Sequence, residues 1–151
     1  MNIEKIIFYV FKKIYNRSTL FLRVHYYKFA GVVIGKDCFI SPKAFIDISK
    51  SGLIEIGENC MITRDCIILC HSDEKKGGIR KLFGEREYGT VKIGNNVFIG
   101  VDSVILPGTT IGDNVVIGAK SLVKGNIPSN CVALGIPAKK YKEINEFLGE
   151  K

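Results

Sequence analysis

The chain lacks the features of several protein classes. It has no tryptophan, two histidines and four prolines among its 151 residues, and no apolar run approaches the about 18 residues that a membrane-spanning helix needs. Its five cysteines form no CxxC pair. Two lysines break the apolar segment 6–11 and no small-residue cleavage site follows it, which argues against a secretory signal. We therefore expect a reduced, cytoplasmic protein with buried thiols.

Positive charge is unevenly distributed along the chain. The formal net charge is +7. Residues 1–30 carry six basic side chains and one acidic side chain, a net charge of +5, whereas residues 31–151 carry 16 basic and 14 acidic side chains, a net charge of +2. A domain that coats nucleic acid needs a basic stripe of its own, so we expect no nucleic-acid partner.

The strongest pattern in the chain is a repeat of six residues. Isoleucine, with one valine, occupies the phased positions: Ile34, Ile40, Ile46, Ile56, Ile62, Ile68, Ile93, Ile99, Ile105, Ile111, Ile117 and Val123. The residue two positions earlier is mostly small or medium-sized, and Gly, Asn or Asp commonly follows. Each repeat therefore predicts a short strand with one buried face and a tight turn. Since three repeats close one triangular coil, the pattern predicts an all-β solenoid of about four coils.

The segments Ile93–Gly100 (Ile-Gly-Asn-Asn-Val-Phe-Ile-Gly) and Ile111–Ala119 (Ile-Gly-Asp-Asn-Val-Val-Ile-Gly-Ala) carry a resemblance to a known family. They resemble the hexapeptide-repeat acyltransferases, in particular the sugar and serine O-acetyltransferases of the galactoside and maltose acetyltransferase type. The resemblance implies a left-handed parallel β-helix, acetyl-CoA as the donor, and a homotrimer with its active sites between neighbouring subunits. We expect the β-helix over residues 31–137.

Two interruptions and two terminal segments complete the expected architecture. The phase breaks after Ile46, which predicts a bulge at Ser49–Leu53, and again after Ile68, which predicts a long excursion loop over residues 72–90. Residues 1–30 are expected to form an amphipathic, basic helical segment that either caps the open end of the β-helix or lies on anionic lipid. Residues 138–151 are expected to form a closing segment with a short helix at Tyr141–Leu148.

His71 is the candidate catalytic residue. It follows Ile68 where the excursion departs, and histidine is the side chain best suited to proton transfer near pH 7. The resemblance implies that a histidine at this position is the general base, which takes a proton from an acceptor hydroxyl during direct acetyl transfer. Asp73 is the candidate acid that orients the imidazole, with Asp65 or a backbone carbonyl as alternatives. Cys70 is interpreted as a bystander.

The donor site also follows from the resemblance. The family lays the pantetheine arm of the cofactor along the last coils, between two subunits. The matching positions are Phe98, Gly100, Val101, Gly118, Ala119 and Lys124. Lys139 and Lys142 match the positions of basic residues that bind the 3′-phosphate of CoA. The acceptor site has the weaker candidates Arg64, Arg80 and Tyr88, whose cations suit an acidic or phosphorylated sugar.

The expected function is acetyl-CoA-dependent O-acetylation of a sugar hydroxyl in bacterial surface polysaccharide biosynthesis, with a small-molecule or lipid-linked sugar as acceptor. Two alternatives stay open, namely an amino-sugar N-acyltransferase on the same fold and a non-catalytic β-helix scaffold that assembles partners or rests on the inner face of the membrane. No metal is expected, because the zinc hydratases of this fold need three histidines per site and the chain has two.

Overall fold

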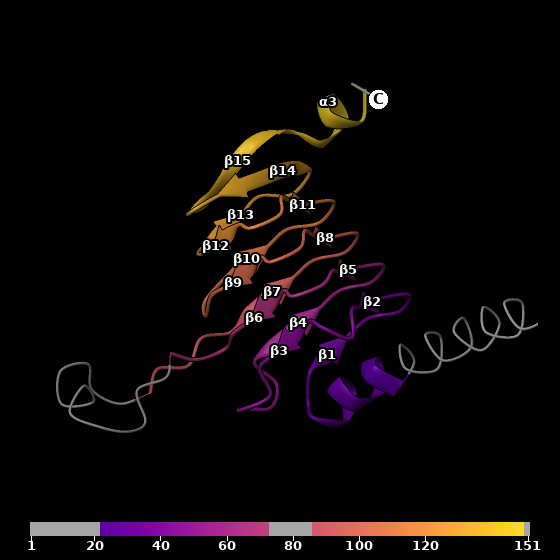
Figure 1. The fold of residues 1–151 in the computed structure, drawn as a ribbon, viewed down its shortest axis with the longest axis vertical. Coiled ribbons are helices and arrows are strands. Elements are labelled where there is room, and N and C mark those ends of the chain that lie inside the picture. Colours follow the sequence, from indigo (N-terminus) through magenta and orange to yellow (C-terminus); the bar gives the residue numbers. More distant parts are fainter. Residues whose placement is uncertain (1–21, 73–85, 150–151) are drawn as a thin grey trace, which may run out of the picture.

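The computed structural model describes residues 22–72 and 86–149, which form a stack of triangular coils (Figure 1). Each coil contributes one short strand to each of three parallel sheets. The first sheet contains β1 (Val33–Ile34), β4 (Ile54–Ile56), β7 (Val91–Ile93), β10 (Thr110–Ile111) and β13 (Asn126–Ile127). The second contains β2 (Phe39–Ile40), β5 (Met61–Ile62), β8 (Phe98–Ile99), β11 (Val116–Ile117) and β14 (Cys131–Gly135), and the third contains β3 (Phe45–Ile46), β6 (Ile67–Ile68), β9 (Val104–Ile105) and β12 (Leu122–Val123). The predicted parallel β-helix is confirmed.

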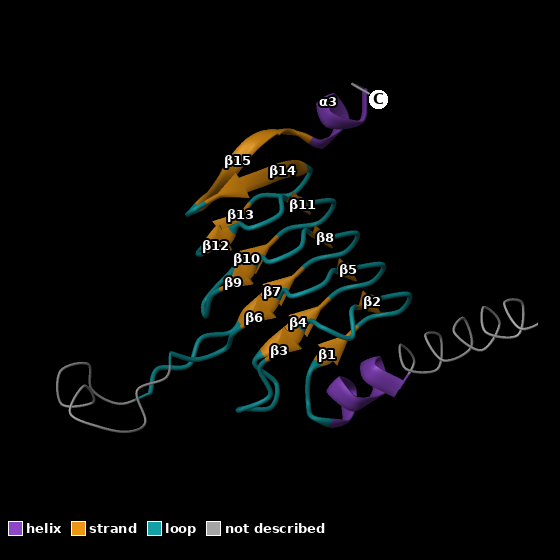
Figure 2. Ribbon diagram, in the orientation of Figure 1, coloured by secondary structure: helices purple, strands orange, loops and turns teal. Residues whose placement is uncertain are grey.

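The six-residue repeat places its phased side chains inside the prism. All twelve phased residues are buried, and their pairing is in register from coil to coil, as in Ile40 with Ile62 and Ile62 with Ile99. The residue before each phased position faces outward, because strand side chains alternate. The predicted four coils are complete, and β13 and β14 begin a fifth (Figure 2).

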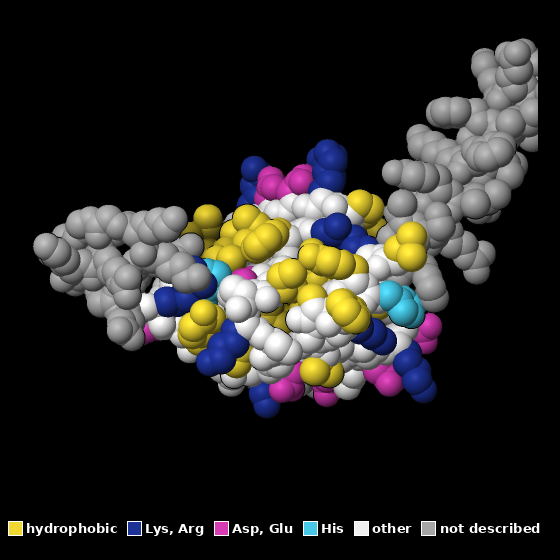
Figure 3. All heavy atoms as spheres, turned by 90° about the horizontal axis from the view of Figure 1, so that it is seen from below, with side chains coloured by type: hydrophobic (Ala, Val, Ile, Leu, Met, Phe, Trp, Pro, Cys, Tyr) yellow, Lys and Arg dark blue, Asp and Glu magenta, His cyan; other side chains and the backbone are white. Residues whose placement is uncertain are grey.

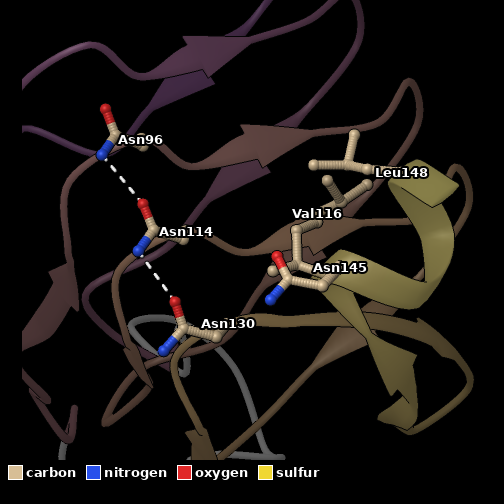
Figure 4. Close-up of a pocket in the computed structure, with 7 residues that line it drawn as sticks. Asn96, Asn114, Val116, Asn130, Asn145 and Leu148 are labelled. Carbon is tan, nitrogen blue, oxygen red and sulfur yellow. Dashed lines mark hydrogen bonds between the residues drawn. The ribbon is translucent and has the colours of Figure 1, made fainter.

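Asparagines stack at the corner between the first and second sheets, which we call the first corner. Asn59, Asn96, Asn114 and Asn130 all have left-handed backbone conformations, with φ between 54° and 60°. Their side-chain amides donate from coil to coil at 2.9, 2.9 and 2.8 Å. The upper part of this ladder borders a hollow of about 330 Å³ beneath the C-terminal helix α3 (Ile144–Gly149) (Figure 4). The ladder explains why asparagine recurs in the repeat. Asparagine tolerates the left-handed backbone of the turn, and its side-chain amide hydrogen-bonds to the asparagine of the next coil.

Both interruptions of the repeat leave the prism at one corner, between the third and first sheets, which we call the third corner. Ile46 pairs with Ile68, so the chain departs from the prism at the same corner in two successive coils. The excursion has a narrow antiparallel neck, in which Ser72 donates to the Glu87 carbonyl at 3.0 Å and Gly89 donates to the Cys70 carbonyl at 2.9 Å. Residues 73–85, and with them Asp73 and Arg80, lie outside the described residues.

A helix at residues 22–29 covers the first coil. Tyr27 is buried on the first coil, and its hydroxyl accepts a hydrogen bond from Arg23 at 3.0 Å. Residues 22–29 thus pack on the open end of the β-helix, whereas the helix predicted nearer the N-terminus lies outside the described residues. Among the residues described here, no helix is long and apolar enough to cross a membrane.

The prediction for the C-terminal segment is partly wrong. Tyr141 and the two residues after it belong to β15 (Ala138–Glu143), which pairs antiparallel with β14, and α3 begins only at Ile144. The reason is that β14 leaves its open edge at the top of the second sheet, and the chain turns back at Gly135 to pair with that edge. Local helical periodicity was overridden by strand pairing.

Candidate active site

His71 lies at the third corner, at the base of the excursion. It comes three residues after Ile68 at the end of β6, and it pairs with Tyr88 in an isolated antiparallel bridge. The rings of His71 and Tyr88 are tilted, with centroids 5.9 Å apart. The side chain of His71 is 13% exposed. The neck of the excursion therefore holds the imidazole at the edge of the third sheet with limited access to solvent.

Asp47 holds one ring nitrogen of His71. Its Oδ2 contacts His71 Nδ1 directly, and Ser49 Oγ lies 2.9 Å from the same nitrogen. Asp47 directly follows the phased Ile46 in the coil beneath, and it is 4% exposed. Asp73, the candidate from sequence, lies outside the described residues, and Asp65 instead pairs with Arg64 at 3.0 Å. The sequence did hold a signal for Asp47. The repeat breaks after Ile46 and again after Ile68, and these two residues pair in neighbouring coils, so the residues that follow them lie close together.

The surroundings of Asp47 keep its carboxylate ionised. Burial by itself raises the pKa of the Asp47 carboxyl, but hydrogen bonds from Ser49 and from Cys70 outweigh it and hold this pKa well below its ordinary value. Ser49 N–H donates to Oδ1 at 2.9 Å, and the Cys70 N–H donates to Oδ2 at 3.1 Å. An ionised carboxylate only accepts hydrogen bonds, so His71 Nδ1 carries the proton of the neutral ring. Nε2 is then the basic nitrogen.

Cys70 is a hydrogen-bond donor in this cluster. Its Sγ lies 3.2 Å from Asp47 Oδ2. Burial, followed by the hydrogen bond to Asp47, raises the pKa of the Cys70 thiol. A nucleophilic cysteine needs the opposite shift, so the bystander interpretation agrees with the geometry.

Asp47, Cys70 and His71 also offer three ligand atoms of the kinds that bind metal ions, all within 4.8 Å of one another. Cys70 Sγ and His71 Nδ1 already hydrogen-bond to Asp47 Oδ2, so hydrogen bonding alone explains why the three side chains lie together. The expectation of a metal-free site stays a prediction.

The surroundings of the imidazole are cationic and aromatic. Lys50 Nζ lies 4.7 Å from the centroid of the Tyr88 ring, and the Arg86 guanidinium lies 5.9 Å from it. Tyr88, a predicted acceptor residue, is thus brought to His71, and Lys50 is an additional neighbour that the sequence analysis did not consider. Arg64 lies elsewhere, at the corner between the second and third sheets. Arg80 lies outside the described residues.

The predicted donor residues occupy two corners and one sheet face. Gly100, Val101, Gly118 and Ala119 stack at the corner between the second and third sheets, which we call the second corner. Gly100 must be glycine there, since a Cβ would lie 2.6 Å from the Ala119 nitrogen. Phe98 projects from the outer face of the second sheet. Lys124 follows β12 at the third corner, two coils above His71.

A groove runs beside the second corner on the outer face of the third sheet. It encloses about 430 Å³ and is lined by Asp65, Ile67, Asp102, Val104, Lys120, Ser121, Leu122 and Ile136. Lys120 Nζ lies 3.5 Å from Asp102. Lys139 lies on β15 opposite Leu134, whose side chain packs over Gly118, while Lys142 lies farther along β15 opposite Val132. The groove itself therefore combines apolar side chains with one lysine and the two carboxylates of Asp65 and Asp102.

Comparisons with known proteins show which family the chain resembles. Residues 90–125 match the family described as bacterial transferase hexapeptide (six repeats). The chain is 36% identical over 123 residues to WbbJ of Escherichia coli (strain K12), which is named for O-acetyl transfer in lipopolysaccharide biosynthesis. That alignment covers 81% of this chain and 55% of WbbJ, so the chain spans about half of that relative's length.

Two further similarities cover more of the related protein. Protein CapG of Staphylococcus aureus is 43% identical over 122 residues, covering 78% of this chain and 69% of CapG. A solved galactoside acetyltransferase in complex with coenzyme A aligns with a TM-score of 0.59 and 32% identity, covering 76% of this chain and 66% of that one.

Proposed function

The chain belongs to the hexapeptide-repeat acyltransferases, and on that premise we propose that it transfers an acetyl group from acetyl-CoA to a hydroxyl group of a surface-polysaccharide sugar. The observation that carries this proposal is the buried Asp47–His71 pair at the neck of the excursion, in which the ionised carboxylate contacts Nδ1. The similarity to WbbJ supports a glycan acceptor.

The proposed reaction needs one base and no covalent intermediate on the protein. His71 Nε2 accepts the proton of the acceptor hydroxyl while its oxygen attacks the thioester carbonyl, so that a C–O bond forms. When the tetrahedral intermediate collapses, the C–S bond breaks, and the imidazolium returns the proton to the departing CoA thiolate. Asp47 stabilises the imidazolium that exists between these steps, because its carboxylate stays ionised.

The donor and the base come from different subunits of a homotrimer in this proposal. His71 lies at the third corner and the small residues Gly100 and Ala119 at the second, separated by one side of the prism. Five or six residues at about 3.3 Å each make that side roughly 15–20 Å long. The outer faces of the second and third sheets carry large apolar side chains, namely Phe39, Met61, Phe98, Phe45, Ile67, Val104 and Leu122. Such faces suit packing between subunits around a three-fold axis.

The donor site predicts a specific response to the 3′-phosphate of CoA. Calorimetric titration should show saturable binding of acetyl-CoA to the purified protein, with weaker binding of 3′-dephospho-CoA. Replacing both Lys139 and Lys142 with alanine should lower acetyl-CoA affinity about tenfold while leaving 3′-dephospho-CoA nearly unaffected, since only the phosphate contact is lost. The matched control is Lys92→Ala on the first sheet, which should bind both donors like the wild type.

Absence of binding at millimolar acetyl-CoA would remove the proposal and favour the scaffold. An amino-sugar acceptor is the remaining alternative within the family. Competition between hydroxy- and amino-sugar acceptors for the same acetyl-CoA separates the two activities.

Cys70 should be dispensable for the chemistry. Cys70→Ala removes one thiol hydrogen bond to Asp47, which is expected to lower stability by about 1 kcal/mol and to leave kcat within about tenfold of the wild type, because the N–H donors to Asp47 remain. Steady-state kinetics with thermal unfolding checks both parts. A loss of kcat as large as that of His71→Ala, in a folded variant, would instead indicate an acyl-cysteine intermediate.

A further inference from the structure

The outer side of the helix at residues 22–29 is an apolar stripe with no cover in the described part of the chain. Leu22, Tyr26 and Phe29 are 64%, 55% and 96% exposed. Their spacing of four and three residues places them on one side of the helix. The opposite side carries Tyr27, which is buried on the first coil. The helix is thus anchored by one face while it presents large apolar side chains on the other.

Charge at this end of the molecule differs from charge in the rest of it. Residues 22–53 carry five basic side chains and two acidic ones, a net charge of +3, and one of the acids is the buried Asp47. The other described residues, 54–72 and 86–149, carry eight of each sign. Figure 3 views this end and shows hydrophobic and Lys or Arg side chains across it, with Asp and Glu mostly toward its rim. The stripe therefore lies in a positive surface.

An unsatisfied donor lies beside the stripe. A hollow of about 360 Å³ is lined by Leu22, Arg23, Tyr26 and Pro42. The Nε–H group of Arg23 is buried and has no hydrogen-bond partner in the described part of the chain. A buried guanidinium donor without a partner is costly, and an anionic oxygen is the acceptor that suits it best.

We propose that this end of the molecule, formed by the helix at residues 22–29 and the first coil, docks on an anionic lipid surface. Exposed Leu, Tyr and Phe enter the interface while lysines meet the headgroups, which is the combination that peripheral membrane helices use. Phosphate oxygens of a headgroup approach the Arg23 side chain through the hollow beside the stripe. A second copy of this chain is disfavoured as the occupant, because two such ends would bring like charges together.

The docking places the base near the lipid surface. His71 belongs to the second coil, about 5 Å above the first, and the helix beneath is about 10 Å thick. His71 Nε2 therefore lies roughly 15 Å from the docked face. That height suits the glycan of a lipid-linked sugar, an assignment that rests on the proposed function. A cyclic trimer with its axis along the prism presents three such faces on one side, which strengthens binding.

Vesicle sedimentation of the full chain tests the docking. Wild-type protein should sediment with phosphatidylcholine vesicles in which about half of the lipid is phosphatidylglycerol, which gives the vesicles a strong negative surface charge. It should stay in the supernatant with phosphatidylcholine alone and should be released by high salt. The pair Leu22→Ser and Phe29→Ser should weaken binding at least about tenfold. The matched control is Leu148→Ser on α3, which is 55% exposed at the opposite end and should bind like the wild type.

Other outcomes overturn the proposal. Equal binding to both vesicle types, no binding to either, or equal losses for Leu148→Ser and the double variant would each contradict it. If the double variant instead dissociates an assembly in size-exclusion chromatography, the stripe is a contact between copies. Acetyl-CoA titration of the same samples separates the two proposals. A protein that binds acetyl-CoA but no vesicles would contradict the docking proposal and leave the proposed acetyl transfer standing.

Discussion

Replacing His71 with alanine is expected to lower kcat for acetyl transfer by about 10²–10⁴-fold, the usual contribution of a positioned general base. His71 is not among the residues proposed to bind the donor, so the affinity for acetyl-CoA should change little. The wild-type pH–rate profile should show the ionisation of a base, and this ionisation should be missing in the residual activity of the variant. Steady-state kinetics over a pH series, with acetyl-CoA titration of the same preparations, measures all three.

Two comparisons make the His71 result interpretable. His71→Asn keeps a polar side chain near Asp47 but has no basic nitrogen, so it should lose as much activity as His71→Ala. His25→Ala removes the other histidine of the chain, which lies on the helix that covers the first coil, and should keep wild-type kcat. Full activity in His71→Ala would refute the assignment of the base.

Asp47→Asn is expected to lower kcat by a similar factor of about 10²–10⁴. The NH₂ group of the new asparagine can donate to His71 Nδ1. This hydrogen bond favours the tautomer with its proton on Nε2, so Nε2 can no longer act as the base. The amide also cannot stabilise the imidazolium. Because Asp47 touches no substrate, this is a positioning effect, and KM for acetyl-CoA should stay nearly constant while kcat falls.

The double variant of Asp47 and His71 tests the coupling. If Asp47 acts through the imidazole, Asp47→Asn should cost little further activity in a chain that already carries His71→Ala. Losses that multiply in the double variant would indicate that Asp47 acts independently. Ser49→Ala is a suitable comparison, because it removes one neighbour of Nδ1 while the carboxylate remains.

Asp47 should also make stability depend on pH. Its pKa is held below the ordinary value near 4, so the ionised carboxylate adds stability above about pH 4 that is lost as pH falls toward its folded-state pKa. Urea unfolding should therefore show wild type more stable than Asp47→Asn at pH 7, with a smaller difference at pH 3. A difference that does not change with pH would mean that the stabilisation comes from packing.

Much of the architecture was predictable because the residues within each six-residue repeat specify the local structure. The phased isoleucines, the small residues two positions earlier and the turn-forming Asn and Asp residues specify strand, buried face and corner within six residues. Stacking identical units then leaves few alternatives. Conversely, the C-terminal segment lies beyond the repeat, and its helical periodicity did not reveal that β14 offers an edge to residues 138–143.

The candidate site was likewise only partly predictable from the sequence. The position of His71 followed from the sequence, because the break after Ile68 marks where the chain leaves the prism, and its role as base stays a prediction. The partner of its ring did not follow, since Asp47 is 24 residues away and the nearer candidate was Asp73. Lys50 and the groove on the third sheet were missed for the same reason.

The sequence by itself determined the coil, its period and the corner at which the chain departs, since these depend on residues within one repeat. Only the tertiary structure decided which groups meet at that corner. The side-chain contacts between coils at this corner join residues 21 to 24 positions apart. Their pairing is set by how the two breaks after Ile46 and Ile68 fall in register. The buried hydrogen-bond network around Asp47 is complete only when those coils are stacked, because every bond in it except the local one from Ser49 N–H joins residues of different coils.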